Sequence, residues 1–174
     1  MSILNLLKTI NWKAFDGPIE LPGLVDCELP DLEALSETVS GAGINGEVDM
    51  PTLGHYGPLK LKLNFRQLSK EMLALSMPIA HPIELRGATQ VYNAALGVSQ
   101  VEPVKIVTRS IPKTSPLGKL ATNAATESSV EFEVVYIKVF VGGLPMFELD
   151  KFNGILIVGA YPVMAQVAAA LGGL

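Results

Sequence analysis

Two segments of this chain alternate apolar and polar residues with a period of two, and this pattern limits the fold more than any other feature. In residues 58–66, PLKLKLNFR, polar residues separate four apolar ones, namely Leu59, Leu61, Leu63 and Phe65. Residues 128–141 begin with the same alternation and become apolar on both faces after Val134, apart from Lys138. Successive side chains of a strand point to opposite faces, so both segments are predicted to be half-buried strands. A strand covered on both faces at one end only is typical of a sheet that packs on another subunit.

The rest of the chain also indicates β-structure, punctuated by prolines at strand ends or edges. We expect further strands near residues 9–15, 20–29, 32–39, 82–92, 104–111 and 145–157. Gly142-Gly143 lies between two β-rich runs and predicts a tight hairpin, because primed turns need positive φ. The fold class is therefore mainly β.

Helical signals are confined to two short segments. Ser69 is placed to cap a helix over residues 70–76, and Pro162 is placed to start a C-terminal helix that runs to Ala170. The second helix is apolar nearly all round, so we expect it to be buried, and to be buried between subunits.

Length and composition predict one self-associating domain over residues 1–174, with an N-terminal arm (1–10) and an apolar C-terminal extension (161–174). Residues classed as hydrophobic make up 49% of the chain and charged residues 17%, which excludes intrinsic disorder and predicts extensive self-association. The single cysteine, Cys27, is predicted to be a small buried hydrophobic residue. No secretion signal and no segment long enough to span a membrane is visible, so we expect a cytosolic origin without membrane insertion.

Charge is distributed in two blocks. Residues 14–59 contain nine acids and no Lys or Arg, whereas residues 60–125 contain nine bases and only three acids. Such blocks favour electrostatic pairing between copies of the molecule. Neutralisation of the two blocks within one subunit is an equally open interpretation.

The run G-A-G-I-N-G, residues 41–46, has the glycine spacing of a dinucleotide-binding loop. Such a loop must open a helix whose N-terminus holds the phosphates. The residues that follow, EVDMPTLGHYGP, contain two prolines and two glycines and cannot form that helix. We therefore expect a bend after strand 32–39 that leads into a loop, residues 44–57, ordered by a neighbouring subunit.

The other patterns typical of catalysis are also missing from the sequence. His81 stands between alanine and proline and is interpreted as structural, and no nucleophile motif surrounds a serine. Glu131 and Glu133 share one strand face, which we interpret as solvated. Net charge −4 disfavours nucleic-acid recognition. We predict a protein that is not an enzyme and needs no cofactor and no metal.

Four stretches, in order, resemble the major tail tube proteins of contractile phage tails and of R-type bacteriocins, and cover most of residues 9–160. The first contains Leu29-Pro30, Leu32, Glu37, the 41–46 run and Asp49, and the second is strand 58–66 with the helix after it. The third contains Thr108-Arg109, Lys113, Leu117-Gly118-Lys119 and Thr126-Glu127. The fourth contains Tyr136-Ile137-Lys138, Gly142-Gly143 and FELDKFNGILIVG. The apolar residues 161–174 depart from the family.

This resemblance implies two antiparallel sheets packed as a sandwich or small barrel, with one short flanking α-helix. It also implies a structural subunit of the inner tube of a contractile injection particle, a virion tail or a bacteriocin. In this family hexameric rings stack into a hollow conduit inside a contractile sheath. The implied partners are other copies of the chain, the sheath, a tape-measure protein in the lumen, a baseplate or hub initiator, and transiting DNA that is not bound specifically.

We expect the two charged blocks to meet between copies across the interface of stacked rings. The candidate interface residues are Gly41, Gly43, Gly46, Asp49, Arg109, Lys113, Lys119 and Glu127. Glu131 and Glu133 are candidates for a lumen that is acidic or neutral, so that DNA does not adhere. Two alternatives share the alternating strands: a β-barrel that binds a small molecule or lipid, and the tube protein of a type VI secretion apparatus.

Overall fold

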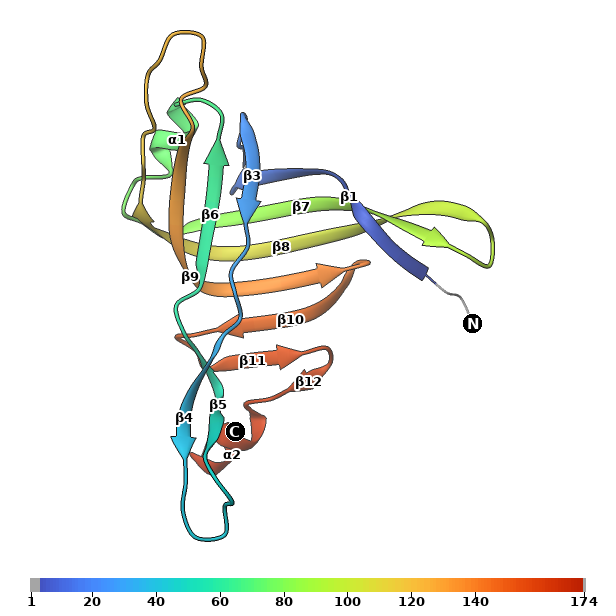
Figure 1. Cartoon of the computed structure of the whole chain (residues 1–174), viewed down its shortest axis with the longest axis vertical. Helices are drawn as coiled ribbons and strands as arrows, with labels where there is room; N and C mark the ends of the chain where they lie inside the picture. Colours follow the sequence, from blue (N-terminus) through green and yellow to red (C-terminus); the bar gives the residue numbers. More distant parts are fainter. Residues whose placement is uncertain (1–3, 174) are drawn as a thin grey trace.

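The structure is a computed structural model that describes residues 4–173, and it is mainly β with two short helices (Figure 1). The strands are β1 (Leu4–Asp16), β2 (Ile19–Glu20), β3 (Leu24–Glu28), β4 (Ala34–Val39), β5 (Val48–Tyr56), β6 (Lys60–Phe65), β7 (His81–Asn93), β8 (Val98–Thr114), β9 (Ser128–Val141), β10 (Leu144–Asp150), β11 (Ile155–Val158) and β12 (Tyr161–Pro162). The helices are α1 (Lys70–Ala74) and α2 (Ala165–Ala170).

Strand β9 organises the larger sheet, which has ten strands. Its first half pairs with β6 and its second half with β10, while β8 pairs along its other edge. The path of the sheet is β12-β11-β10-β9-β8-β7-β1-β2, and β3 is added on β6. All of these pairings are antiparallel, as are those of the second sheet, β4-β5.

Because β9 changes partners half-way, the large sheet folds over itself into two layers. In Figure 1, β3, β6 and the first half of β9 form a column along the long axis, and β7, β8, β10 and β11 run across it. The predicted packing of antiparallel β-layers is confirmed, and the strands of residues 4–173 do not close into a barrel.

The core lies between these layers and follows the alternation seen in the sequence. Leu61, Leu63 and Phe65 are at most 1% exposed, and the β9 side chains Val130 and Phe132 face the same interior. The crossing strands supply Ile83, Leu85, Ile106, Ile137 and Leu149. The solvent-facing partners on β6 are the polar residues of the pattern, so the half-buried strand predicted for 58–66 is confirmed.

Several local predictions are confirmed by the backbone. The Ser69 hydroxyl accepts a hydrogen bond from the Met72 N–H at 3.1 Å and caps α1. Gly142 and Gly143 have φ of +59° and +81° between the paired residues Val141 and Leu144, which makes the predicted hairpin.

His81 is structural, as expected from the sequence. It is 5% exposed, with its ring nitrogens 2.9 Å from Asp16 Oδ2 and 3.1 Å from the Met77 carbonyl oxygen. These contacts tie β1 and the end of the α1 connection to the start of β7.

Three predicted boundaries are wrong. The strand predicted over 20–29 is two strands, because the chain turns at residues 21–23 and Gly23 has φ of +75°. The strand predicted over 145–157 is divided into β10 and β11 by a turn at residues 151–154. The loop predicted over 44–57 is mostly strand β5, which tolerates Pro51 because a two-stranded ribbon leaves each strand with a free edge.

The two ends of the described chain also differ from expectation. Residues 4–10, expected in an N-terminal arm, are the first part of β1 and pair with β7, while residues 1–3 of that arm lie outside the described residues. The C-terminal helix predicted from Pro162 to Ala170 exists as α2 but begins only at Ala165, because Pro162 pairs in β12, and none of the helix residues is buried within the subunit. The fold therefore has two short helices and not the single flanking helix that the resemblance implies. No helix in residues 4–173 has the length and hydropathy that crossing a membrane requires.

Candidate assembly surfaces

The first candidate surface is the β4–β5 hairpin, which extends from one end of the molecule (Figure 1). Gly41, Gly43 and Gly46 lie in its turn, where the φ angles of Gly43 and Gly46 are +89° and +112°. The bend predicted there is confirmed. Asp49 lies on β5 opposite Thr38, and all four candidate residues are exposed.

The hairpin is amphipathic. Val39 pairs with Val48, and the alternation of β4 and β5 places Leu35 and Met50 on the same face, which also carries Glu37 opposite Met50. The four apolar side chains are 41–55% exposed in the subunit. A two-stranded ribbon is marginal by itself in water, so its apolar face indicates a surface that binds protein.

The second candidate surface is the end of β8 together with the loop of residues 115–127, and it carries Lys113, Lys119 and Glu127. Backbone hydrogen bonds order the loop: the Lys119 N–H donates to the Thr126 carbonyl at 3.0 Å within it, and the Glu127 N–H donates to the carbonyl of Arg66, after β6, at 3.2 Å. Two apolar side chains remain bare on it, Leu117 (52% exposed) and Leu120 (91% exposed). The loop is therefore a fixed projection with both basic and apolar groups.

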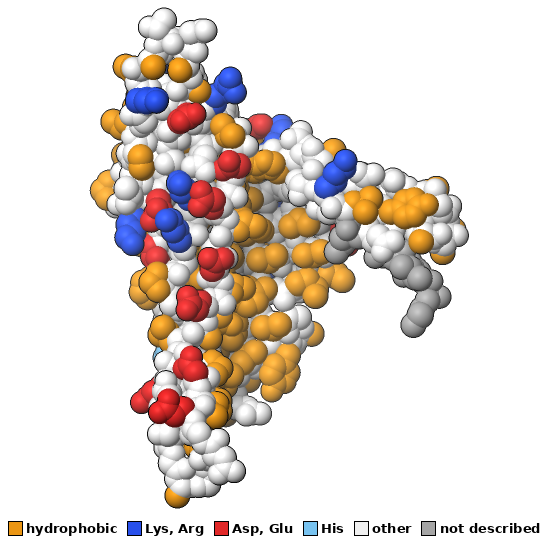
Figure 2. Space-filling model, in the orientation of Figure 1, with side chains coloured by type: hydrophobic (Ala, Val, Ile, Leu, Met, Phe, Trp, Pro, Cys, Tyr) orange, Lys and Arg blue, Asp and Glu red, His pale blue; other side chains and the backbone are white. Residues whose placement is uncertain are grey.

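These two surfaces lie at opposite ends of the long axis (Figure 1). In Figure 2 the charged side chains of the hairpin end are all acidic, whereas Lys and Arg side chains appear only in the other half of the molecule, with acidic ones among them. The candidate residues therefore form two separated groups that a single subunit cannot bring together. Arg109 belongs to neither group, because its guanidinium lies over the Tyr136 ring at 5.9 Å on the large sheet.

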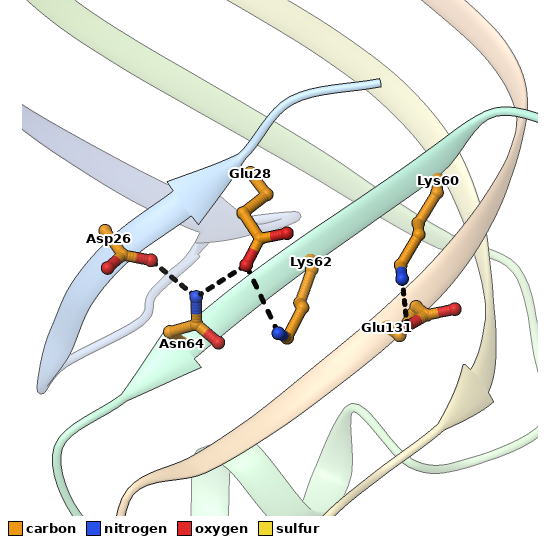
Figure 3. A network of polar contacts seen from close by, with 6 residues as sticks. All are labelled: Asp26, Glu28, Lys60, Lys62, Asn64 and Glu131. Atoms are coloured by element: carbon orange, nitrogen blue, oxygen red, sulfur yellow. Dashed lines mark hydrogen bonds and ion pairs between the residues drawn. The ribbon is translucent and has the colours of Figure 1, made fainter. Parts of the chain in front are cut away.

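Part of the charge is neutralised inside the subunit, on the outer face of the column (Figure 3). Lys60 Nζ lies 2.8 Å from Glu131 Oε2, and Lys62 Nζ lies 3.2 Å from Glu28 Oε1. The hydrogen bond from Lys62 holds the pKa of Glu28 below its ordinary value. Within residues 4–173, no ion pair reaches Lys113, Lys119 or Asp49, so their charges are free for another copy.

Glu131 and Glu133 are less solvated than the sequence predicts. Glu131 pairs with Lys60, and Glu133 accepts hydrogen bonds from Lys151 at 3.0 Å and from the Leu59 N–H at 3.1 Å. Both carboxylates stand across from cations because β6 and the turn after β10 follow one another along the same edge of β9. The surface they occupy is thus locally neutral.

Sheet edges form a third surface. Residues 5–13 of β1 have β7 on one side, and in the described part of the chain no strand pairs along their other side. Leu7 and Ile10 on this edge are each 55% exposed. At the far side of the sheet, β12 pairs through only two residues. Long free edges with apolar side chains invite pairing with another chain.

Sequence reasoning missed one ordered feature, the turn after β10. The Asp150 carboxylate accepts hydrogen bonds from the N–H groups of Phe152 and Asn153, both at 3.0 Å, and from the Asn153 amide at 2.6 Å. The Asp-x-x-Asn-Gly pattern of residues 150–154 is a signal that could have revealed it. Phe152 is 80% exposed at this turn.

A profile of the family of phage tail tube protein FII matches residues 7–172. The chain belongs to this family of phage tail tube proteins. A solved structure with a similar fold is the cryo-EM structure of an anti-feeding prophage cap, which terminates the tube of that particle. The TM-score is 0.55 at 14% identity, and the match covers 80% of this chain and 94% of the cap. No curated protein sequence matches the chain.

Family membership makes this tail tube protein a structural component of a phage tail or a related particle that assembles with itself and with other tail components. The three surfaces described above are consistent with that role, because each leaves apolar groups, charges or backbone groups without a partner in the subunit. Within residues 4–173, no three His, Cys, Asp or Glu side chains gather as a metal site would require.

Proposed function

We propose that this protein forms hexameric rings that stack into the hollow inner tube of a contractile injection particle. The observation that carries the proposal is the separation of the acidic hairpin and of the loop region with Lys113 and Lys119 to opposite ends of one subunit (Figure 1). Different faces then meet in each contact, which is a heterologous interface and continues from copy to copy. A contact of this kind gives a ring where the rotation closes and a filament where it does not.

Both parts of the contact are supplied by the candidate residues. Asp49 and the glycine turn at 41–46 lie on the acidic hairpin, and Lys113 and Lys119 lie on the basic projection. Opposite charge steers the two surfaces together and selects their orientation. Apolar side chains beside the charges, such as Met50 and Leu120, lose water in the contact and supply the binding free energy.

Ring formation requires that the free strand edges be paired as well. Residues 5–13 of β1 offer unpaired N–H and carbonyl groups, and the short β12 forms the other edge of the sheet. When neighbours pair these edges around a ring, the open sheets join into one barrel and no edge remains. This explains why a sheet that stays open in the subunit suits a tube.

In this proposal the tube lies inside a contractile sheath, grows from a baseplate or hub initiator in the bacterial cytoplasm, and holds a tape-measure protein until use. DNA passes without specific binding if the particle has a capsid. The neutral surface around Glu131 and Glu133 is suited to such a lumen, because paired charges neither hold nor repel a polyanion strongly.

Electron microscopy of the purified chain at high concentration tests the proposal. We expect rings and long hollow tubes, and image averaging should give sixfold symmetry. Size-exclusion chromatography at falling concentration should show dissociation into subunits. A monodisperse monomer at all concentrations would refute the tube function and favour a ligand-binding domain, whose natural site would be the cavity described below.

A further inference from the structure

The turn at residues 151–154 holds a bare aromatic side chain on a fixed backbone. Asp150, itself only 7% exposed, accepts the three hydrogen bonds that close the turn, and Gly154 completes it with φ of +63°. Phe152 is nevertheless 80% exposed, more than any other aromatic residue of the described chain. Single exposed apolar residues are ordinary on surfaces, so what distinguishes Phe152 is the hydrogen-bonded turn that carries it.

The residue before the phenylalanine is fixed equally well. The Lys151 ammonium donates to the Gly57 carbonyl at 2.9 Å and to Glu133 at 3.0 Å, and the Lys151 N–H donates to the Val135 carbonyl at 3.1 Å. An aromatic ring presented by such a backbone loses little conformational entropy when it binds. Rigid aromatic anchors of this type dominate the energetics of protein interfaces.

A matching cavity of about 500 Å³ lies in the corner where β3 meets β1, β7 and β8. It is lined mainly by apolar side chains, namely Trp12, Cys27, Leu29, Leu85, Val104 and Ile106. Asp26 and Arg86 add one charge of each sign. Figure 2 shows hydrophobic side chains gathered in the hollow between the column and the crossing strands. The volume is within the range that accommodates an aromatic group.

The turn and the cavity lie toward opposite ends of the crossing strands. Val104 pairs with Val141, next to the Gly142-Gly143 hairpin, whereas Asp150 pairs with Tyr136. These two positions are five residues apart on β9, or about 17 Å at the usual rise of a strand. Phe152 lies beyond Asp150 in the direction away from Val104, so it does not fill the cavity of its own subunit.

We infer that Phe152 of one copy inserts into the cavity beside Trp12 of a second copy, a contact that no motif of the sequence indicated. A second copy is the occupant because the family assembles with itself and because Phe152 and the cavity are displaced from each other along the same strands, so that each can meet a different neighbour. This inference rests on the proposed function. It adds an apolar anchor, separate from the charged ends, that holds neighbouring subunits along the direction of the strands.

Photo-crosslinking of the full chain tests this contact directly. Benzoylphenylalanine at position 152, irradiated under conditions that form tubes, should crosslink to segments 26–29 and 104–106 of another copy, as mapped by mass spectrometry. The matched control carries the probe at Leu96, which is 67% exposed in the turn between β7 and β8 and should not label these segments. Tubes that form without crosslinks from position 152 to the cavity overturn the inference alone, and a chain that remains monomeric overturns the proposed function as well.

A substitution gives an independent readout. Phe152→Ala should fold normally, since the ring is bare in the subunit, and should raise the critical concentration for assembly about tenfold or more. Phe152→Leu should restore most of the loss. The single tryptophan, Trp12, lines the cavity, so its emission should shift to the blue when the wild-type chain assembles. An unchanged critical concentration for Phe152→Ala, or no change in Trp12 emission, contradicts the contact.

Discussion

Gly118 supports the basic projection in a way that a single methyl group can test. It has φ of +80°, and a Cβ placed on it would collide with the Thr126 carbonyl, with the Glu127 carbonyl carbon 3.0 Å away. That same Thr126 oxygen accepts the hydrogen bond from the Lys119 N–H. Gly118→Ala must therefore open the loop that carries Lys119, and both folding and assembly should suffer.

The expected cost of Gly118→Ala has three parts. An L-residue in the left-handed region costs about 1 kcal/mol, and loss of the Lys119–Thr126 hydrogen bond costs about 1 kcal/mol more. Displacing backbone atoms adds about another 1 kcal/mol, so about 3 kcal/mol of unfolding free energy is lost in total. For a domain of this size that lowers Tm by about 6–12 °C.

The matched control is Gly97→Ala, in the turn between β7 and β8. Gly97 has φ of +66°, but no atom lies within 4 Å of its Cβ position, so only the backbone cost of about 1 kcal/mol applies. Urea unfolding of both variants, below the concentration at which subunits assemble, measures the difference. If the two variants lose the same stability, the close packing of the loop on Thr126 is refuted.

Three further predictions concern charged or ionisable side chains of the subunit. Charge reversal at Lys113 and Lys119 places negative charges at both ends of the subunit. Sedimentation should therefore show fewer tubes at low salt, with a partial recovery as salt screens the repulsion. Equal tube yields at all salt concentrations would argue against the charged contact. Burial raises the pKa of Asp150, but its hydrogen bonds from Asn153 and Phe152 outweigh this and hold the pKa below its ordinary value. The carboxylate therefore contributes stability that is present above about pH 4 and is lost as the pH falls further. In Asp150→Asn the urea concentration at the midpoint of unfolding should fall less steeply with decreasing pH in this range. A variant whose midpoint follows the wild-type pH dependence would exclude this role. Burial, and after it the charges of Asp26 and Glu28, raise the pKa of Cys27 to about 12. Alkylation of the Cys27 thiol in the native subunit at pH 8 should therefore be about a thousandfold slower than in the chain unfolded in urea. Similar rates in the two states would show that the native thiol is accessible and ionised.

The failed predictions have two different physical origins. Pro51 and Gly54 suggested a loop, yet both are tolerated in the two-stranded ribbon, because each of its strands makes ladder hydrogen bonds along one edge only, whereas a central strand makes them along two. The turn at residues 151–154 was missed because the apolar segments before and after it were interpreted as one continuous strand. In β5 the pairing of two strands therefore outweighs the local loop signal, whereas at residues 151–154 the local hydrogen bonds to Asp150 interrupt the apolar pattern.

The sequence by itself determined the local character of this protein. The period of two in residues 58–66 and 128–134 set which side chains enter the core, because adjacent strand residues always point to opposite faces. Paired glycines at 142–143 set a hairpin, and the composition predicted association with other copies, which is also what membership of the family implies. The resemblance to tail tube proteins rested on motifs in order and is confirmed by the family match.

Only the tertiary structure decided how these pieces meet. Alternation says which face of β9 is buried, but it does not say that β6 pairs with one half of the strand and β10 with the other. That choice depends on side-chain packing between residues far apart in the chain. It separates the acidic hairpin from the basic loop, forms the cavity beside Trp12, and leaves Phe152 bare at the far end of the strands.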